Sequence, residues 1–275
     1  MNWLADIEDP YKMSKMSASF GLSIADETIA LTDELLSLLT NNLFSYVQLP
    51  NTNYIGKLSK KSLTKLDLVT EFSSSLTENI YSQRSNHKDE FVAQFAELLD
   101  NVSSMLTKKN LNLNGIEFSA DFKKIFSDPY VLKSNVELLT MLGLHLIKHD
   151  VKLLLPIPVP SDFVAYPGHF LLFLKNIMLP NYLLSFDINP HKSPFSSDDV
   201  VKILEEFLPM IGVIRFVYDA TAGNNLVEAN LRDWFKVLYR FGYSKGIVFK
   251  PLSTSHDVIL SEFQEIVSLL ETMAD

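Results

Sequence analysis

The feature of this sequence that most constrains its fold is a repeated alternation between short β-rich runs and longer segments with helical periodicity. The runs are apolar and tend to end in polar or turn residues, whereas the segments between them carry apolar residues at three- and four-residue steps. The β-rich runs are residues 20–25, 43–49, 67–72, 114–119, 151–157, 182–188, 213–219 and 247–251. This alternation is typical of βαβ units that build a parallel sheet.

Helical periodicity follows most of these runs. The predicted helices span residues 26–39, about 89–108, 134–148, 166–178, 197–208, 226–241 and 256–273. Asp26 is expected to cap the first of them, because its carboxylate can accept an unpaired N–H of the first turn. The Lys- and Ser-rich stretch between residues 50 and 67 shows no convincing helix. The sequence therefore predicts eight strands and at least seven helices.

Eight such units in a chain of 275 residues favour a single-domain α/β fold, the (β/α)8 TIM barrel. A doubly wound open sheet is the alternative, since periodicity alone does not exclude it. However, no G-x-G-x-x-G or G-x-x-x-x-G-K-[ST] pattern follows the first strand, so the usual nucleotide-binding signals of an open sheet are missing. We expect an N-terminal extension over residues 1–16 and one barrel domain over 17–275.

Composition narrows the partners and the compartment. The chain has 24 basic and 33 acidic residues and a net charge of −9, which argues against a broad nucleic-acid or anionic-membrane surface. It has no cysteine, which excludes disulfides, thiolate nucleophiles and Cys-based metal sites. The first sixteen residues lack the basic and apolar regions of a secretory signal. We expect a cytoplasmic protein without membrane segments, and leave a homo-oligomer open.

The last third of the chain carries a more specific pattern. Residues 213–219 (VIRFVYD), 231–243 (LRDWFKVLYRFGY) and 246–250 (GIVFK) resemble the last two units of the xylose isomerase-like TIM barrels, the sugar phosphate isomerase/epimerase family. Residues 182–191 (YLLSFDINPH) resemble the sixth strand of that family. The resemblance rests on the order and spacing of elements and covers most of the chain from Phe20 onward. It implies a barrel with a sugar-like ligand at the carboxyl ends of its strands.

The resemblance also implies where a metal site belongs. The family binds one divalent metal through a glutamate of strand five, an aspartate of strand six, a histidine and a glutamate of strand eight. Asp187 matches the aspartate, and His191 lies one residue later than the usual histidine of strand six. Tyr218 stands where a histidine is expected on strand seven, followed by Asp219. His191, Tyr218 and Asp219 are candidates for ligand binding, and Asp187 and His191 for binding Mn²⁺, Mg²⁺ or Zn²⁺.

Both family glutamates are missing here. Strand five ends in Leu155-Pro156, and strand eight ends in Lys250-Pro251. A hard dication needs several anionic oxygens, so the resemblance implies a degraded metal site. Lys250 either takes over the electrostatic role of the metal, or pairs with Asp187 or Asp219 and fills a retired site.

Glu71, Glu117 and Ser253 each have a functional and a structural interpretation. Glu71 at the end of the third strand is a candidate general base, and Glu117 in the fourth strand is a weaker one. Either carboxylate can instead pair with a basic side chain such as Arg215. Ser253 precedes a helix and can help to hold a phosphate there, or can simply cap that helix.

Three histidines favour a structural reading. His145 and His149 have the i, i+4 spacing of some zinc sites, but no glutamate follows His145 and no third ligand is evident, so a solvated helix end is favoured. His169 lies in the first turn of the predicted helix 166–178, where surface packing is the better prediction.

Three functions follow from these residues. The first is a sugar or sugar-phosphate isomerase/epimerase-related protein that moves a proton beside a carbonyl, with Glu71 or Asp187 as the base and Lys250 or a weak metal stabilising the enediolate. The second is a catalytically inactive barrel that binds a carbohydrate-like ligand or a protein partner. The third is lyase or aldolase chemistry through a Schiff base on Lys250.

Overall fold

A computed structural model describes the fold over most of the chain. The described residues are 18–24, 32–41, 44–51, 54, 67–72, 86–109, 112–118, 121–158, 167–177, 179–188, 197–218, 234–253 and 255–274. The expected N-terminal extension and the predicted cap Asp26 lie outside them. None of the described helices is long and apolar enough to cross a membrane.

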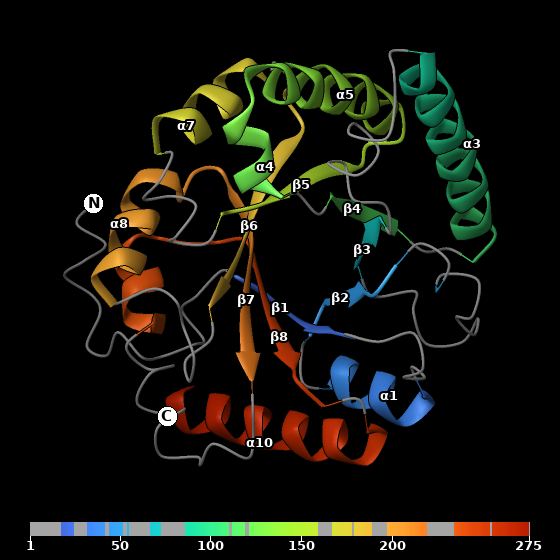
Figure 1. Ribbon diagram of the computed structural model, residues 1–275. Coiled ribbons are helices and arrows are strands. Elements are labelled where there is room, and N and C mark those ends of the chain that lie inside the picture. Colours follow the sequence, from blue (N-terminus) through green and yellow to red (C-terminus); the bar gives the residue numbers. More distant parts are fainter. Residues whose placement is uncertain are drawn as a thin grey trace, which may run out of the picture.

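The strands all run parallel and pair in the order of the sequence (Figure 1). They are β1 (Ser19–Ser23), β2 (Tyr46–Leu49), β3 (Asp67–Phe72), β4 (Asn112–Phe118), β5 (Lys152–Pro156), β6 (Tyr182–Ile188), β7 (Ile211–Tyr218) and β8 (Gly246–Pro251). β8 also pairs with β1, with Phe20 opposite Ile247 and Leu22 opposite Phe249, so the sheet closes on itself. This parallel pairing confirms the α/β prediction and excludes the open doubly wound sheet.

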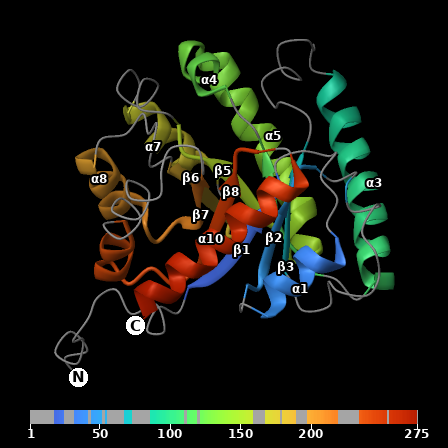
Figure 2. The same cartoon turned by 90° about the horizontal axis from the view of Figure 1, so that it is seen from below.

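Helices surround the strands on the outside (Figure 1). They are α1 (Asp33–Asn41), α3 (Asn86–Lys109), α4 (Phe122–Ser127), α5 (Pro129–Lys148), α7 (Pro167–Asn176), α8 (Ser197–Phe207) and α10 (His256–Ala274), and residues 234–240 are helical as well. Figure 2 places α10 beside α1, and the Oγ1 atom of Thr32 lies 3.4 Å from Nε2 of His256. The connection from β2 to β3 lies mostly outside the described residues, so the structure does not test whether a helix follows β2.

The start of α5 differs from the prediction. The expected helix 134–148 begins at Pro129, and the short helix α4 precedes it. Each helix has an aspartate cap: Asp121 Oδ1 accepts from Lys124 N at 3.1 Å, and Asp128 Oδ1 accepts from Tyr130 N at 2.8 Å. Pro129 takes the first helical position, where a missing N–H costs nothing.

Two apolar layers hold the structure together. The larger layer lies between the strands and the helices, and it includes phenylalanines such as Phe95, Phe118 and Phe249, each at most 1 % exposed. A second, smaller cluster holds Tyr46, Leu154, Val213 and Val248, with Leu183 packed against it. Residues of the second cluster alternate along their strands with residues of the first, so they point into the barrel. Polar side chains follow this inner cluster toward the carboxyl ends of the strands.

Candidate functional site

The polar side chains inside the barrel form a layer of their own. Gln48 follows Tyr46 by two positions on β2, Ser185 follows Leu183 on β6, and Arg215 follows Val213 on β7. Because successive side chains of a strand alternate between its faces, residues two apart share a face and lie about 7 Å apart along the strand. The polar layer therefore lies directly above the apolar inner cluster, on the side of the strands' carboxyl ends.

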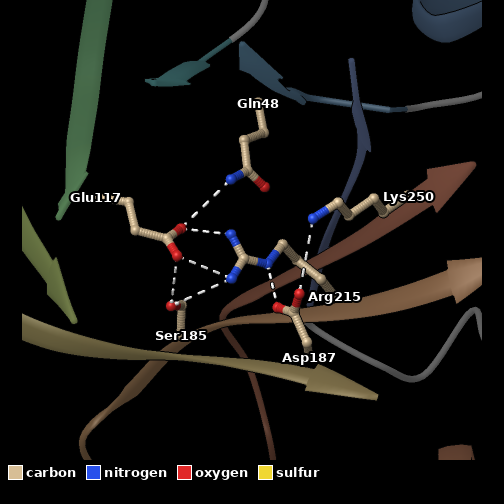
Figure 3. A network of polar contacts seen from close by, with 6 residues as sticks. All are labelled: Gln48, Glu117, Ser185, Asp187, Arg215 and Lys250. Atoms are coloured by element: carbon tan, nitrogen blue, oxygen red, sulfur yellow. Dashed lines mark hydrogen bonds and ion pairs between the residues drawn. The ribbon is translucent and has the colours of Figure 1, made fainter. Parts of the chain in front are cut away.

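Arg215 and Glu117 form the centre of this layer (Figure 3). The Arg215 guanidinium donates from Nη1 to Glu117 Oε2, and from Nη2 to Glu117 Oε1 at 2.9 Å, as a two-pronged ion pair. Both side chains are buried, with 6 % and 8 % exposure. Ser185 Oγ donates to Glu117 Oε1 at 3.2 Å, and Gln48 Nε2 donates to Glu117 Oε2 at 3.3 Å. The predicted alternative that Glu117 pairs with Arg215 is confirmed, whereas a structural role for this carboxylate stays a prediction.

Asp187 and Lys250 extend the network toward the mouth of the barrel. Nε of Arg215 donates to Oδ1 of Asp187, while Nζ of Lys250 lies 3.7 Å from Oδ2 of the same carboxylate. The Asp187 side chain is 40 % exposed and that of Lys250 is 33 % exposed. These two side chains are thus open to solvent above a buried arginine. The pairing of Lys250 with Asp187 agrees with the prediction that these two residues form an ion pair. Whether Lys250 also takes over the electrostatic role of a metal stays a prediction.

The protonation state of Arg215 follows from its surroundings. Burial lowers the pKa of Arg215, but the charges of Glu117 and Asp187 and their hydrogen bonds more than offset this effect, so the pKa lies above its ordinary value. The guanidinium is therefore a permanent cation inside the barrel. It stands beside two carboxylates that would otherwise be free to bind a positively charged ligand.

The described side chains do not fit a divalent metal. Both carboxylate oxygens of Asp187 face cations, Oδ1 the Arg215 guanidinium and Oδ2 the Lys250 ammonium. A dication on Asp187 would be repelled by these neighbours, and a hard dication needs more anionic oxygen than one carboxylate supplies. Within the described ranges, no three His, Asp or Glu side chains come together as a metal-binding group.

The structure locates only part of the predicted site. His191 and Asp219 lie outside the described residues. Glu71 and Tyr218 are described in their backbone alone, and Glu71 pairs in register with Glu117 of the neighbouring strand. Ser253 Oγ accepts from the backbone N–H of Ser255 at 3.1 Å, directly before α10, which agrees with a capping role. The predicted catalytic role of Glu71 and the predicted ligand-binding roles of the other four residues remain predictions.

His149 and His169 make contacts within the protein. His149 Nε2 lies 3.0 Å from Asp100 Oδ1, and this contact links the end of α5 to α3. The centroids of the His169 and Phe126 rings lie 6.2 Å apart.

The sequence analysis did not select Gln48 or Ser185, and it named Arg215 only as a partner for a carboxylate. An inward-facing polar residue in an otherwise apolar strand was the available signal for all three.

Solved structures with this fold have several activities. No family model matches the sequence, and no curated protein matches it. An L-ribulose 3-epimerase is similar with a TM-score of 0.59 and 14% identity, covering 93% of this chain and 95% of the other. A sugar phosphate isomerase/epimerase from Parabacteroides distasonis gives a TM-score of 0.57, 13% identity and coverage of 94% and 96%.

A family 2 AP endonuclease from Brucella melitensis gives a TM-score of 0.54, 15% identity and coverage of 88% and 96%. Identities this low establish a shared fold and leave the activity open. The fold of this chain is therefore that of the xylose isomerase-like and sugar phosphate isomerase/epimerase proteins.

Proposed function

We propose that this chain is a sugar or sugar-phosphate isomerase/epimerase-related protein, built as a complete (β/α)8 barrel, that binds a carbonyl sugar at the carboxyl ends of its strands. The observation that carries this proposal is the half-exposed pair of Asp187 and Lys250 at the mouth, held from below by the buried Arg215. Active sites of barrels of this kind lie at that end. Solved structures with this fold include a D-psicose 3-epimerase and an L-ribulose 3-epimerase.

The proposed chemistry needs a base and a positive charge near each other. Asp187, or Glu71 of β3, takes a proton from the carbon beside the sugar carbonyl, and the electrons of that bond form an enediolate. The Lys250 ammonium stabilises the negative enediolate oxygen, which is the part that a metal plays in other enzymes. In isomerisation, the proton of the hydroxyl group on the deprotonated carbon moves to the former carbonyl oxygen, and the base returns its proton to the former carbonyl carbon. In epimerisation, the other of the two carboxyl groups delivers a proton to the opposite face of the same carbon, and the carbonyl forms again.

One observation favours a second candidate, a barrel that binds a carbohydrate-like ligand without reacting. Both oxygens of Asp187 already contact cations of the protein, Oδ1 the Arg215 guanidinium and Oδ2 the Lys250 ammonium. In this case Lys250 and Asp187 hold sugar hydroxyl groups, and no proton moves.

Solvent exchange distinguishes the two candidates. The protein is incubated in D₂O with a panel of ketoses, aldoses and their phosphates, and proton NMR follows loss of the signal from the carbon beside the carbonyl. The isomerase proposal expects exchange that survives EDTA and falls by about 10²-fold or more in Asp187→Asn. Lys250→Met should also lose exchange, whereas Lys202→Met, a change on the exposed face of α8, should retain it.

Calorimetric titration with the same sugars completes the experiment. Sugar binding without exchange would establish the second candidate. Absence of both binding and exchange across the panel would overturn both candidates. Borohydride trapping of a sugar on Lys250 would instead show a Schiff base and support the lyase or aldolase chemistry.

A further inference from the structure

The opposite end of the barrel contains a cavity that the proposed site does not use. It has a volume of about 230 Å³ and opens among the first residues of several strands, including Ser19 of β1, Lys152 of β5 and Gly246 of β8. Tyr46, Leu154 and Val213 of the inner apolar cluster line it. The cavity thus has an apolar interior and lies one layer below the Arg215 network.

Glycine creates part of this space. A Cβ atom added at Gly246 would have Gly212 O at 3.4 Å, Val213 Cγ2 at 3.6 Å and Tyr46 Cζ at 3.8 Å as its nearest neighbours. These are ordinary contact distances, so a side chain at Gly246 would begin without a clash and would extend toward cavity-lining residues. Gly115 and Gly212 also line the cavity.

The charge around the cavity is positive, although the chain as a whole carries −9. Its described lining includes Lys152 and Lys245 and no acidic residue. Lys245 Nζ donates to the Pro209 carbonyl at 2.7 Å, and burial lowers the pKa of this lysine. Lys152 forms no ion pair with any residue that the structure describes, so its ammonium can bind an anion at the opening.

The size of the cavity limits what enters. An engineered protein cavity of about 150 Å³ takes up benzene, and the present cavity of about 230 Å³ adds room for a small polar head group. The apolar lining favours a compact apolar body, and the lysines favour a negative charge at the open end. A sugar would place several hydroxyl groups against apolar side chains, which costs free energy.

We propose that this cavity is a second binding site, for a small monocarboxylate with a compact apolar body of about the size of benzoate. The apolar body contacts Tyr46, Leu154 and Val213, and the carboxylate lies at the opening beside Lys152 and Lys245. This site is independent of the proposed function, because none of its lining residues belongs to the network of Arg215.

Fluorine NMR of 4-fluorobenzoate with the purified protein tests the proposal. We expect saturable binding, competition by benzoate, and no competition by the neutral isostere benzamide. Lys152→Met should weaken binding roughly five- to tenfold, because it removes one charge-assisted contact. Lys175→Met, a matched change on the exposed side of α7, should leave binding unchanged.

A second variant tests the location. Gly246→Val fills the cavity and should abolish binding, while its circular dichroism and its exchange or sugar binding at the mouth match those of the wild type. The proposal is overturned if 4-fluorobenzoate fails to bind, if benzamide competes as well as benzoate, or if Lys152→Met binds as tightly as the wild type. The last comparison remains decisive even if Gly246→Val fails to fold.

Discussion

Arg215 illustrates how a charge is kept inside a barrel. Its guanidinium has 6 % exposure and donates to two carboxylates, Glu117 and Asp187, while Lys250 balances the second negative charge. Two cations and two anions leave the cluster neutral. A buried charge without such compensation would cost several kcal/mol, so the cluster depends on every member. The arginine fixes the orientation of Asp187, which is the group with solvent access.

Removing the central cation should therefore destabilise the protein. We expect Arg215→Met to lower the free energy of unfolding by roughly 3–5 kcal/mol, since it leaves Glu117 buried without a counter-charge. Arg215→Lys keeps the charge but loses the two-pronged geometry. Its free energy of unfolding should therefore lie between those of the wild type and Arg215→Met. Urea unfolding followed by circular dichroism measures these values. A stability of Arg215→Met equal to that of the wild type would contradict this account of the network.

Tyr243 should make the stability depend on pH. Its hydroxyl donates to the Gly246 carbonyl at 2.9 Å. Burial raises the pKa of Tyr243 well above the ordinary value of 10.0, and the electrostatic interaction with Tyr46 raises this pKa further. The folded protein keeps this proton at a pH where the unfolded chain releases it. The contribution is therefore complete below about pH 10 and is lost as the pH rises further, by up to about 1.4 kcal/mol per pH unit.

The measurement compares urea unfolding of the wild type and Tyr243→Phe between pH 8 and 11. The variant should be about 1 kcal/mol less stable at pH 8, because it loses a hydrogen bond. The difference should shrink above pH 10, because only the wild type has this proton to lose. A constant difference over the whole range would show that Tyr243 does not titrate differently in the two states.

At the scale of elements, the sequence predicted the strands better than the ends of the helices. The bounds of β3 and β6 agree with the predicted runs. A parallel strand of a barrel is a short run rich in apolar and β-branched residues, and polar or turn residues mark its ends. α5 was predicted five residues too short at its start. Asp128-Pro129 is a typical helix start, but the apolar periodicity from residue 134 onward is the stronger signal and set the predicted boundary.

The Asp128 cap should have a measurable effect on α5. Asp128→Ala removes the acceptor for Tyr130 N, and we expect it to lower the free energy of unfolding by about 1 kcal/mol. Asp128→Asn retains a side-chain oxygen in the same place and should cost less. Chemical unfolding of the three proteins provides the comparison. Equal losses for alanine and asparagine would show that the cap oxygen is not the cause.

At the scale of the whole molecule, the inside of the barrel is filled in layers whose members come from different strands. Sequence analysis predicted closure from the number of units, but it did not predict which side chains meet. Glu117 and Arg215 lie 98 positions apart in the sequence and contact each other only through the registers of β4 to β7. The sheet has two register irregularities, one between β3 and β4 and one between β6 and β7, and no sequence signal fixes either of them.

Two glycines of the inner face provide a matched pair of variants. A Cβ at Gly21 would lie 2.6 Å from Tyr46 Cβ and 2.7 Å from Tyr46 O, so β1 and β2 would have to separate. We expect Gly21→Ala to cost roughly 1–3 kcal/mol of unfolding free energy. Gly246→Ala meets no atom closer than 3.4 Å and should be neutral or slightly stabilising. Thermal unfolding measures the stability of both variants. A Gly246→Ala protein less stable than the Gly21→Ala protein would contradict this account of the inner packing.

The pairing of β1 with β8 has a consequence for how the chain folds. β1 and β2 are separated by fewer than thirty residues, whereas β1 and β8 are separated by more than two hundred. Contacts between such distant segments slow folding, because the entropy of closing a long loop is lost before the strand pairing provides any stabilisation. During synthesis, the last strand becomes available only after every other strand has left the ribosome. Until then both outer strands expose unpaired backbone groups that can pair with other chains. The period of greatest aggregation risk is therefore the time before the ring closes, and the stability of the finished fold gives no protection during that time.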